Sequence, residues 1–201
     1  MSPLKSSIPQ FKEKYFKIGR VRDTAQDILD YVKRHSHIKN IIFTPQHSAL
    51  LCLDMQKYFL NPESHAFVPS APSIIGNIRC LIECYLHHGR PVFLTRHVNT
   101  EDDAGMMAIW WHDLIREGEN SVLIDELLID DVNVIRKSQY DAFYDTDLEE
   151  MLHSTQSEHV VICGVMTHLC CETTARDAFM HDYEVYFVVD ATAADTEELH
   201  M

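Results

Sequence analysis

The chain alternates short, unbroken apolar runs with longer segments in which apolar residues recur at helical spacing. The run "SALLCLDM", from Ser48 to Met55, shows no alternation of apolar and polar positions, which is typical of a strand covered on both faces. Similar runs predict further strands at "RPVFLTRHV", "DVNVIRK", "EHVVICGV" and "EVYFVVDATA". The sequence therefore predicts a sheet with a helical layer on each side.

Segments of helical periodicity lie between these strands. Helices are predicted over residues 23–35, 74–88, 146–154 and 169–182, whereas 105–118 is a tryptophan-bearing helix or lid and 121–128 has no clear pattern. Strands that alternate with helices predict a parallel sheet in an α/β layer architecture. We expect two parts, an N-terminal arm and helix over residues 1–45 and one domain over residues 46–201.

Composition and charge narrow the classes of partner. The chain of 201 residues has 46% hydrophobic and 24% charged residues, which is ordinary for a soluble globular protein. Its net charge of −14 argues against a nucleic-acid partner and against binding to an anionic membrane. The sequence shows no apolar run long enough for a transmembrane helix and no secretory signal.

The cysteines point to a reducing compartment. Six cysteines are too sparse for a disulfide scaffold, and most of them lie in apolar runs where reduced, buried cysteine is expected. Cys80 and Cys84, which are spaced by one helical turn, are expected to pack in the core for this reason. These features predict a cytoplasmic protein.

Polar residues follow the predicted strands directly. Asp54 ends the first strand, His97 ends the second and Lys137 ends the third, while the turn after the fourth strand leads to Cys170. Ligands of open α/β sheets bind beyond the carboxyl ends of the strands, so these side chains could converge on one crevice. Each of them also has an ordinary structural role, as a turn former, a solvated cation or a buried thiol.

An acid, a cation and a thiol at one site form a set suited to nucleophilic catalysis. Only the thiolate attacks, and a helix N-terminus and a nearby Lys137 would both lower the pKa of Cys170. Asp54 could accept the thiol proton and return it to a leaving group, and backbone N–H groups of the turn could stabilise an oxyanion.

The adjacent Cys170 and Cys171 cannot both face this crevice, because successive helical side chains point about 100° apart. Cys171 continues an apolar stripe with Ala175, Ala178 and Phe179. The periodicity therefore assigns Cys171 to the buried face and Cys170 to the crevice.

Four further residues are candidates for substrate contact. His97 could bind a substrate carbonyl or carboxylate, and Trp110, beside Trp111, could belong to a lid over a small flat substrate. Phe59 and Tyr140 follow the segments that carry Asp54 and Lys137 and could wall the pocket. A structural histidine, an aromatic anchor and core packing are the respective alternatives.

Three segments together resemble the isochorismatase-like hydrolase superfamily of cysteine hydrolases. They are "LLCLDMQKYFL", "VIRKSQYDAF" and "VVICGVMTHLCCETTARDAFMHDYEVYFVVDATA", and the likeness spans roughly residues 45–199. The resemblance implies a three-layer α/β/α sandwich around a mainly parallel, Rossmann-like sheet of five or six strands. It also implies an Asp54–Lys137–Cys170 triad that hydrolyses C–N bonds of small amides through a thioester.

The same resemblance has implications for the turn before Cys170 and for assembly. It implies a non-proline cis peptide at Val165–Met166, with the Met166 and Cys170 amides aimed at an oxyanion. It further implies a small-molecule substrate and a homo-oligomer, a dimer or a tetramer. Relatives usually continue beyond the position of Met201, so we expect that the chain could be truncated there.

Two alternatives remain open at this stage. Isochorismatase proper cleaves a vinyl ether without a cysteine nucleophile, so that Asp54 would act as the acid and Cys170 would be dispensable. A non-catalytic relative would use the pocket only to bind a ligand. The segment after Asp54 lacks the D-x-H pair with which nicotinamidases hold a metal, and we therefore expect no metal and no cofactor.

Overall fold

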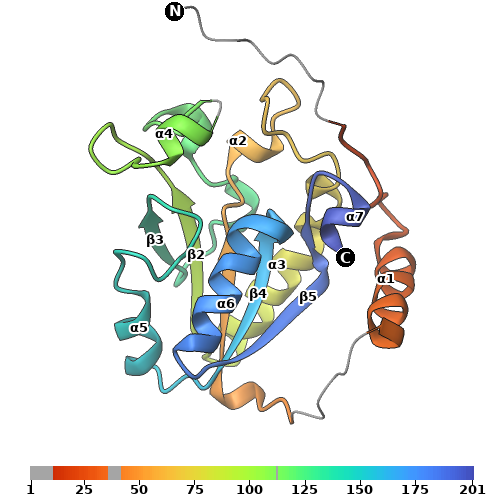
Figure 1. The fold of residues 1–201 in the computed structure, drawn as a ribbon. Helices are drawn as coiled ribbons and strands as arrows, with labels where there is room; N and C mark the ends of the chain where they lie inside the picture. Colours follow the sequence, from red (N-terminus) through yellow and green to blue (C-terminus); the bar gives the residue numbers. More distant parts are fainter. Residues whose placement is uncertain (1–10, 36–41, 112) are drawn as a thin grey trace, which may run out of the picture.

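A computed structural model describes residues 11–35, 42–111 and 113–201. Its centre is one sheet with the strand order β3-β2-β1-β4-β5, in which every neighbouring pair is parallel. Figure 1 shows the strands fanned around the central β1, with their carboxyl ends toward α2 and α4. The predicted α/β class and parallel sheet are confirmed. The strands are β1 Ser48–Leu53, β2 Val92–His97, β3 Asn133–Lys137, β4 His159–Val165 and β5 Glu184–Ala193.

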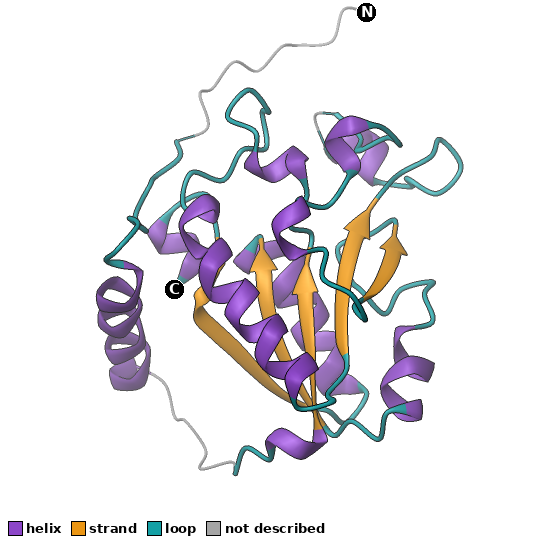
Figure 2. Ribbon diagram, turned by 180° about the vertical axis from the view of Figure 1, so that it is seen from behind, coloured by secondary structure: helices purple, strands orange, loops and turns teal. Residues whose placement is uncertain are grey.

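Helices cover both faces of the sheet, as Figures 1 and 2 show from opposite sides. One face packs against α1 (Val21–His35) and α3 (Ala71–His87), and the other packs against α5 (Leu148–Ser154) and α6 (Glu172–Met180). The three-layer sandwich is therefore confirmed. The remaining helices are short: α2 Lys57–Leu60, α4 Met107–Trp110 and α7 Glu197–His200, with 3₁₀ turns at Pro45–His47, Glu119–Ser121 and Asp125–Leu127 and a π-helical turn at Thr167–Cys171.

The strand order places a topological switch point beside β1. From β1 the chain moves outward to β2 and β3, and then returns to the other side of β1 to form β4 and β5. Side chains after β1 and β4 meet at such a point, because the connections on its two sides turn away from each other. The residues that follow β1 and β4 are Asp54 and the turn that carries Cys170.

Some predicted elements differ from the observed ones. Among the described residues of the segment 105–118, the only α-helix is the four-residue α4, and the predicted helix over 169–182 is a π-helical turn followed by α6. Cys80 and Cys84 are exposed rather than buried. The reason is that α3 buries the stripe Ile74, Ile78 and Ile82, and both cysteines lie off that stripe.

The described part of the N-terminal arm packs into the same core as the sheet. Phe16 is fully buried, and its N–H donates to Ser70 Oγ at 3.1 Å. Val21 and Ile28 of α1 belong to the core cluster on the α3 face. The predicted boundary near residue 45 stays a prediction, and residues 1–10 and 36–41 lie outside the described part. No helix among the described residues is long and apolar enough to cross a membrane.

Candidate active site

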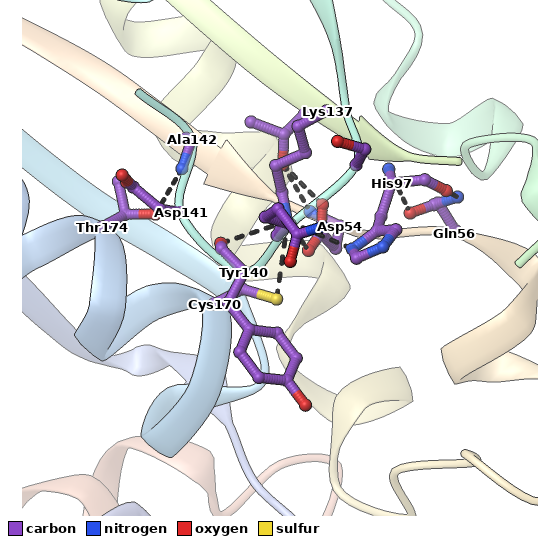
Figure 3. Close-up of polar contacts among 12 residues, drawn as sticks. Asp54, Gln56, His97, Lys137, Tyr140, Asp141, Ala142, Cys170 and Thr174 are labelled. Atoms are coloured by element: carbon purple, nitrogen blue, oxygen red, sulfur yellow. Dashed lines mark hydrogen bonds and ion pairs between the residues drawn. The ribbon is translucent and has the colours of Figure 1, made fainter. Parts of the chain in front are cut away.

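Three strand ends bring Asp54, Lys137 and Cys170 together at the carboxyl edge of the sheet. Asp54 directly follows β1, Lys137 is the last residue of β3, and Cys170 lies in the π-helical turn after β4. All three are buried, with relative exposures of 0%, 1% and 3%. Figure 3 shows their side chains directed toward one another, with His97 beside them.

The Asp54 carboxylate is held by two partners. Thr95 Oγ1 donates to Asp54 Oδ1 at 2.6 Å, and Lys137 Nζ lies 2.8 Å from Oδ2. The backbone of Asp54 has φ of 52°, a left-handed conformation that aspartate tolerates better than most residues. Thr95 Oγ1 also accepts from the Asp54 N–H at 3.1 Å. The Thr95 hydroxyl thus holds both the backbone and the carboxylate of Asp54.

The Lys137 ammonium is the centre of the cluster. Besides Asp54, it lies 3.5 Å from Cys170 Sγ and donates to the carbonyls of Gln139 and Tyr140 at 2.8 and 3.2 Å. Burial alone disfavours the charged amine, but the Asp54 carboxylate and the Cys170 sulfur raise the pKa of Lys137 above its ordinary value. The two neighbouring groups therefore favour the charged form of the lysine at this site.

The π-helical turn directs the Cys170 side chain toward the Lys137 ammonium. Its i to i+5 geometry is seen in the Cys171 N–H, which donates to the Met166 carbonyl at 3.2 Å. Such turns recur at functional sites because they displace one side chain from the regular helical position. As the periodicity predicted, Cys171 packs on the opposite face with Ala178, whereas Phe179 is 74% exposed and does not extend the stripe.

The protonation of Cys170 differs from the prediction. Burial, and then the Asp54 carboxylate, raise the pKa of this thiol well above its ordinary value, and Lys137 only partly offsets them. The predicted depressed pKa is therefore wrong for the resting site, because the thiol is desolvated and faces an anion as well as a cation. The resting thiol is therefore neutral and lies beside the Asp54–Lys137 ion pair.

His97 contributes a neutral imidazole. Asn99 Nδ2 donates to the Ser138 carbonyl at 2.7 Å, which leaves Asn99 Oδ1 to accept from His97 Nε2 at 3.0 Å. His97 Nδ1 then faces Lys137 Nζ at 3.4 Å with its lone pair. Burial and the Lys137 ammonium lower the pKa of His97 to about 4. The ring is therefore an uncharged part of the cavity wall.

Two residues that the sequence did not single out hold the strand ends in register. Gln56 Oε1 accepts from the His97 N–H at 2.9 Å, and Gln56 Nε2 donates to the carbonyls of His97 and Ser121 at 2.9 and 2.7 Å. Asn99 fixes His97 as described above. Gln56 lies inside the segment "LLCLDMQKYFL", but no spacing rule distinguishes it from a surface glutamine.

Backbone geometry brings β4 close to β1 just before the site. Gly164 has φ of +111°, and a Cβ added there would lie 2.1 Å from the Leu53 carbonyl oxygen. Only glycine allows this approach. The next peptide bond, Val165–Met166, is cis, as the family resemblance implied.

A small apolar cavity opens onto the thiol. Its volume is about 10 Å³, which is room for roughly one water molecule. Phe59, His97 and Tyr140 line it, and the Tyr140 hydroxyl is buried with no hydrogen-bond partner among the described residues. The full lining is Phe59, His97, Met107, Trp111, Ile115, Tyr140, Met166, Leu169 and Cys170.

The structure corrects the predicted position of Trp110. Trp110 is 78% exposed and does not line the cavity, whereas Trp111 does. The two neighbouring side chains point in different directions at the end of α4, so only one of them can face the thiol. His168 is also directed elsewhere and lines a separate cavity with Thr167 and His200.

Trp111 is held in the cavity wall by the Tyr58 hydroxyl. Trp111 Nε1 donates to Tyr58 Oη at 3.2 Å, and Tyr58 Oη donates to the Asp113 carbonyl at 2.7 Å. His65 Nε2 lies 2.5 Å from the same oxygen. One hydroxyl thus ties the cavity wall to the loop after α2.

Replacing Tyr58 by phenylalanine is expected to loosen Trp111. With Trp110 replaced by phenylalanine as background, acrylamide quenching of the remaining tryptophan should increase about two- to tenfold, since one net hydrogen bond is lost. Tyr144, which is 60% exposed, provides the matched control as Tyr144→Phe. Equal quenching in the Tyr58 and Tyr144 variants would show that the hydroxyl does not hold the ring.

The cluster also contains a group of possible metal ligands. Ligand atoms of Asp54, His97 and Cys170 lie within 4.8 Å of one another. However, the Lys137 ammonium already contacts Asp54 Oδ2, His97 Nδ1 and Cys170 Sγ. A divalent cation would have to displace this ion pair, so the donor set fits a lysine-centred cluster better than a metal centre.

Comparisons with known proteins agree on one family. The isochorismatase domain profile matches residues 48–201. The chain is 38% identical to nicotinamidase 3 of Arabidopsis thaliana over 76% of each protein. It is 36% identical to enterobactin synthase component B of Escherichia coli, over 79% of this chain but only 57% of that protein.

The solved structures agree with this result. A cysteine hydrolase from Pseudomonas syringae superposes with a TM-score of 0.74 at 28% identity, over 79% of this chain and 78% of that one. Both the fold and the sequence of this chain thus match the same group of proteins.

Proposed function

Because the chain belongs to the isochorismatase family, we propose that it hydrolyses the C–N bond of a small, uncharged amide through a thioester on Cys170. The observation that carries this proposal is the cluster itself. Cys170 Sγ lies 3.5 Å from Lys137 Nζ, which in turn lies 2.8 Å from Asp54 Oδ2. The similar proteins include a nicotinamidase and a cysteine hydrolase, which supports the reaction class.

Proton transfer through Asp54 would activate the thiol only during the reaction. As Sγ bonds to the substrate carbonyl carbon, its proton passes to the Asp54 carboxylate, and Lys137 stabilises the developing negative charge on sulfur. Asp54 then gives the proton to the leaving nitrogen, which departs as ammonia or an amine and leaves the thioester. Asp54 then takes a proton from a water molecule, whose oxygen bonds to the thioester carbon; the C–S bond breaks, the carboxylic acid leaves, and Asp54 returns the proton to the sulfur. This order fits a resting thiol whose pKa is raised.

The chemistry of the cavity favours an uncharged substrate. Apart from His97, Tyr140 and Cys170, its lining is apolar, and the imidazole is neutral. The Tyr140 hydroxyl has no hydrogen-bond partner among the described residues and could bind one polar substrate atom. Among the described lining residues no arginine or lysine is present, and the charge of Lys137 is balanced by Asp54.

Vinyl-ether hydrolysis of the isochorismatase type is the second candidate, favoured by the matched domain profile. In that reaction Asp54 would protonate the substrate and Cys170 would not be needed. Isochorismate carries two carboxylates, and the described lining offers no free cation for either of them. We therefore rank this reaction below amide hydrolysis.

The test is a search for the covalent intermediate. The protein is mixed with a panel of aryl and alkyl amides, ureido compounds and isochorismate, quenched in acid, and measured by intact mass and peptide mapping. We expect an acyl adduct on the peptide that contains Cys170 for an amide or ureido compound that is turned over. Turnover of isochorismate alone, with no adduct, would replace the proposed reaction by ether hydrolysis.

A further inference from the structure

The N-terminal arm contacts two segments that hold the walls of the cavity beside Cys170. Its described residues, 11–20, precede α1 and pass beside α7, as Figure 1 shows. On one side the arm contacts the loop after α2, residues 61–70. On the other side it contacts residues 194–200, which follow β5 and include α7. The arm thus joins two segments that are distant in the sequence.

One side chain of the arm, Lys12, contacts both segments. Its Nζ donates to the carbonyls of His65 and Phe67 at 2.9 and 2.8 Å. The same Nζ lies 3.2 Å from Asp195 Oδ1, and the two side chains are 18% and 4% exposed. Salt screens such a shielded ion pair less than a pair on the open surface. The Lys12 ammonium therefore fastens the loop after α2 to the segment after β5.

The loop after α2 leads to the cavity wall that contains Phe59. The peptide unit that accepts from Lys12 at the Phe67 carbonyl also donates through the Val68 N–H to the Phe59 carbonyl, at 2.9 Å. Phe59 lines the cavity beside the thiol. Two hydrogen bonds in series thus connect Lys12 to this wall.

The same loop supports Trp111 on that wall. His65, whose carbonyl accepts from Lys12, places its ring Nε2 2.5 Å from Tyr58 Oη. Tyr58 Oη is the atom that accepts from Trp111 Nε1. The position of the His65 backbone therefore bears on the position of the tryptophan.

The segment after β5 leads to the turn that carries Cys170. His200, the last residue of α7, donates from Nε2 to the Val189 carbonyl at 3.1 Å, which leaves Nδ1 to accept from the Thr167 hydroxyl at 2.8 Å. Burial lowers the pKa of His200 to about 4, so the ring stays neutral and keeps this acceptor. Thr167 begins the π-helical turn, and Cys170 lies in it.

We propose that Lys12 is a positioning residue that holds the two walls of the Cys170 cavity at the spacing that a substrate needs. Its part in substrate binding rests on the proposed function, whereas its hold on the walls does not. Asp54 is fixed at the strand ends by Thr95 and by its ion pair with Lys137. Loss of the Lys12 ammonium should therefore loosen the walls and leave the reacting groups in place.

Alkylation of Cys170 measures the walls without a substrate. The thiol is 3% exposed, so iodoacetamide reaches it only when a wall moves. In Lys12→Met we expect Cys170 to be labelled about three- to tenfold faster, since charge-assisted hydrogen bonds are lost. Cys52 and Cys171 are fully buried in the core, and their labelling should stay unchanged. Peptide mapping with fragment spectra distinguishes Cys170 from Cys171.

Kinetics on the amide identified in the adduct search provide a second readout. Lys12→Met should raise KM about three- to tenfold and change kcat by less than about twofold, because the walls serve binding rather than bond cleavage. Lys12→Arg should restore part of the change, since a guanidinium donates to the same carbonyls. Lys14→Met, which removes an exposed lysine of the same arm, should alter neither labelling nor KM.

Three results would overturn the proposal. The first is unchanged labelling of Cys170 in Lys12→Met. The second is equal acceleration at Cys52 and Cys171, which would show a general loss of stability. The third is a lower kcat at unchanged KM, which would place the effect on bond cleavage. If no amide is turned over, the proposed function fails and the labelling alone decides on Lys12. If Lys12→Met does not fold, Lys12→Gln must show the same selective acceleration at Cys170.

Discussion

Replacing Cys170 by alanine is expected to reduce turnover of an amide substrate by about 10⁴-fold or more, because removal of a nucleophile disables the whole catalytic unit. Asp54 and Lys137 would remain in place, since their ion pair at 2.8 Å does not depend on the sulfur. Cys170→Ser should be nearly as inactive, because a buried hydroxyl with Asp54 as its base is a far weaker nucleophile than a thiolate. Steady-state rates and the loss of the acyl adduct measure the effect.

Cys171→Ala is the matched control for this experiment. Its side chain is fully buried in the core on the α6 face of the sheet, so the variant should lose some stability but keep its turnover. Full activity of Cys170→Ala on an amide would contradict the thioester route. Full activity of that variant on isochorismate would instead favour the ether hydrolysis in which the cysteine is dispensable.

The sequence was sufficient to predict the meeting of Asp54, Lys137 and Cys170 because a parallel sheet fixes where strand ends lie. Each of the three follows an apolar run directly, and parallel strands bring all their carboxyl ends to one edge. Cys171 could be separated from Cys170 in the same way, since its spacing to Ala178 matches a buried helical stripe. These inferences needed only the direction of the chain and the period of the elements.

The surroundings of these side chains, in contrast, could not be predicted from the sequence. The raised pKa of Cys170 results from burial and from the Asp54 carboxylate, both of which depend on packing. Whether Trp110 or Trp111 faces the thiol depends on the end of the four-residue α4, which no periodicity sets over so few residues.

The charges of the Asp54–Lys137–Cys170 cluster balance, and under the proposed function this balance would couple activity to stability. The Asp54 carboxylate and the Lys137 ammonium have exposures of 0% and 1%, and the neutral Cys170 thiol and the neutral His97 add no charge. A buried ion pair contributes little to net stability, but removing one partner leaves an uncompensated charge. The same change should therefore affect both turnover and folding, and the two effects can be separated.

Replacing Asp54 by asparagine is expected to stop both candidate reactions. Amide hydrolysis loses the base that accepts the thiol proton, and ether hydrolysis loses its acid, so turnover should fall by about 10³-fold or more. The unpaired Lys137 ammonium should also lower the free energy of unfolding by about 3–5 kcal/mol. Rates on the identified substrate and urea unfolding curves measure the two effects. Asp102→Asn, which removes an exposed carboxylate, controls for the change in net charge.

The double variant Asp54→Asn with Lys137→Met separates the two roles of Asp54. Because it removes both buried charges, it should be more stable than Asp54→Asn alone, and the double-mutant cycle should give a coupling energy of more than about 1 kcal/mol. Turnover should nevertheless stay lost, since neither the proton acceptor nor the cation is present. If Asp54→Asn retains full activity, both catalytic roles of Asp54 are wrong. If the two single changes are simply additive in stability, the ion pair at 2.8 Å does not govern the fold of the site.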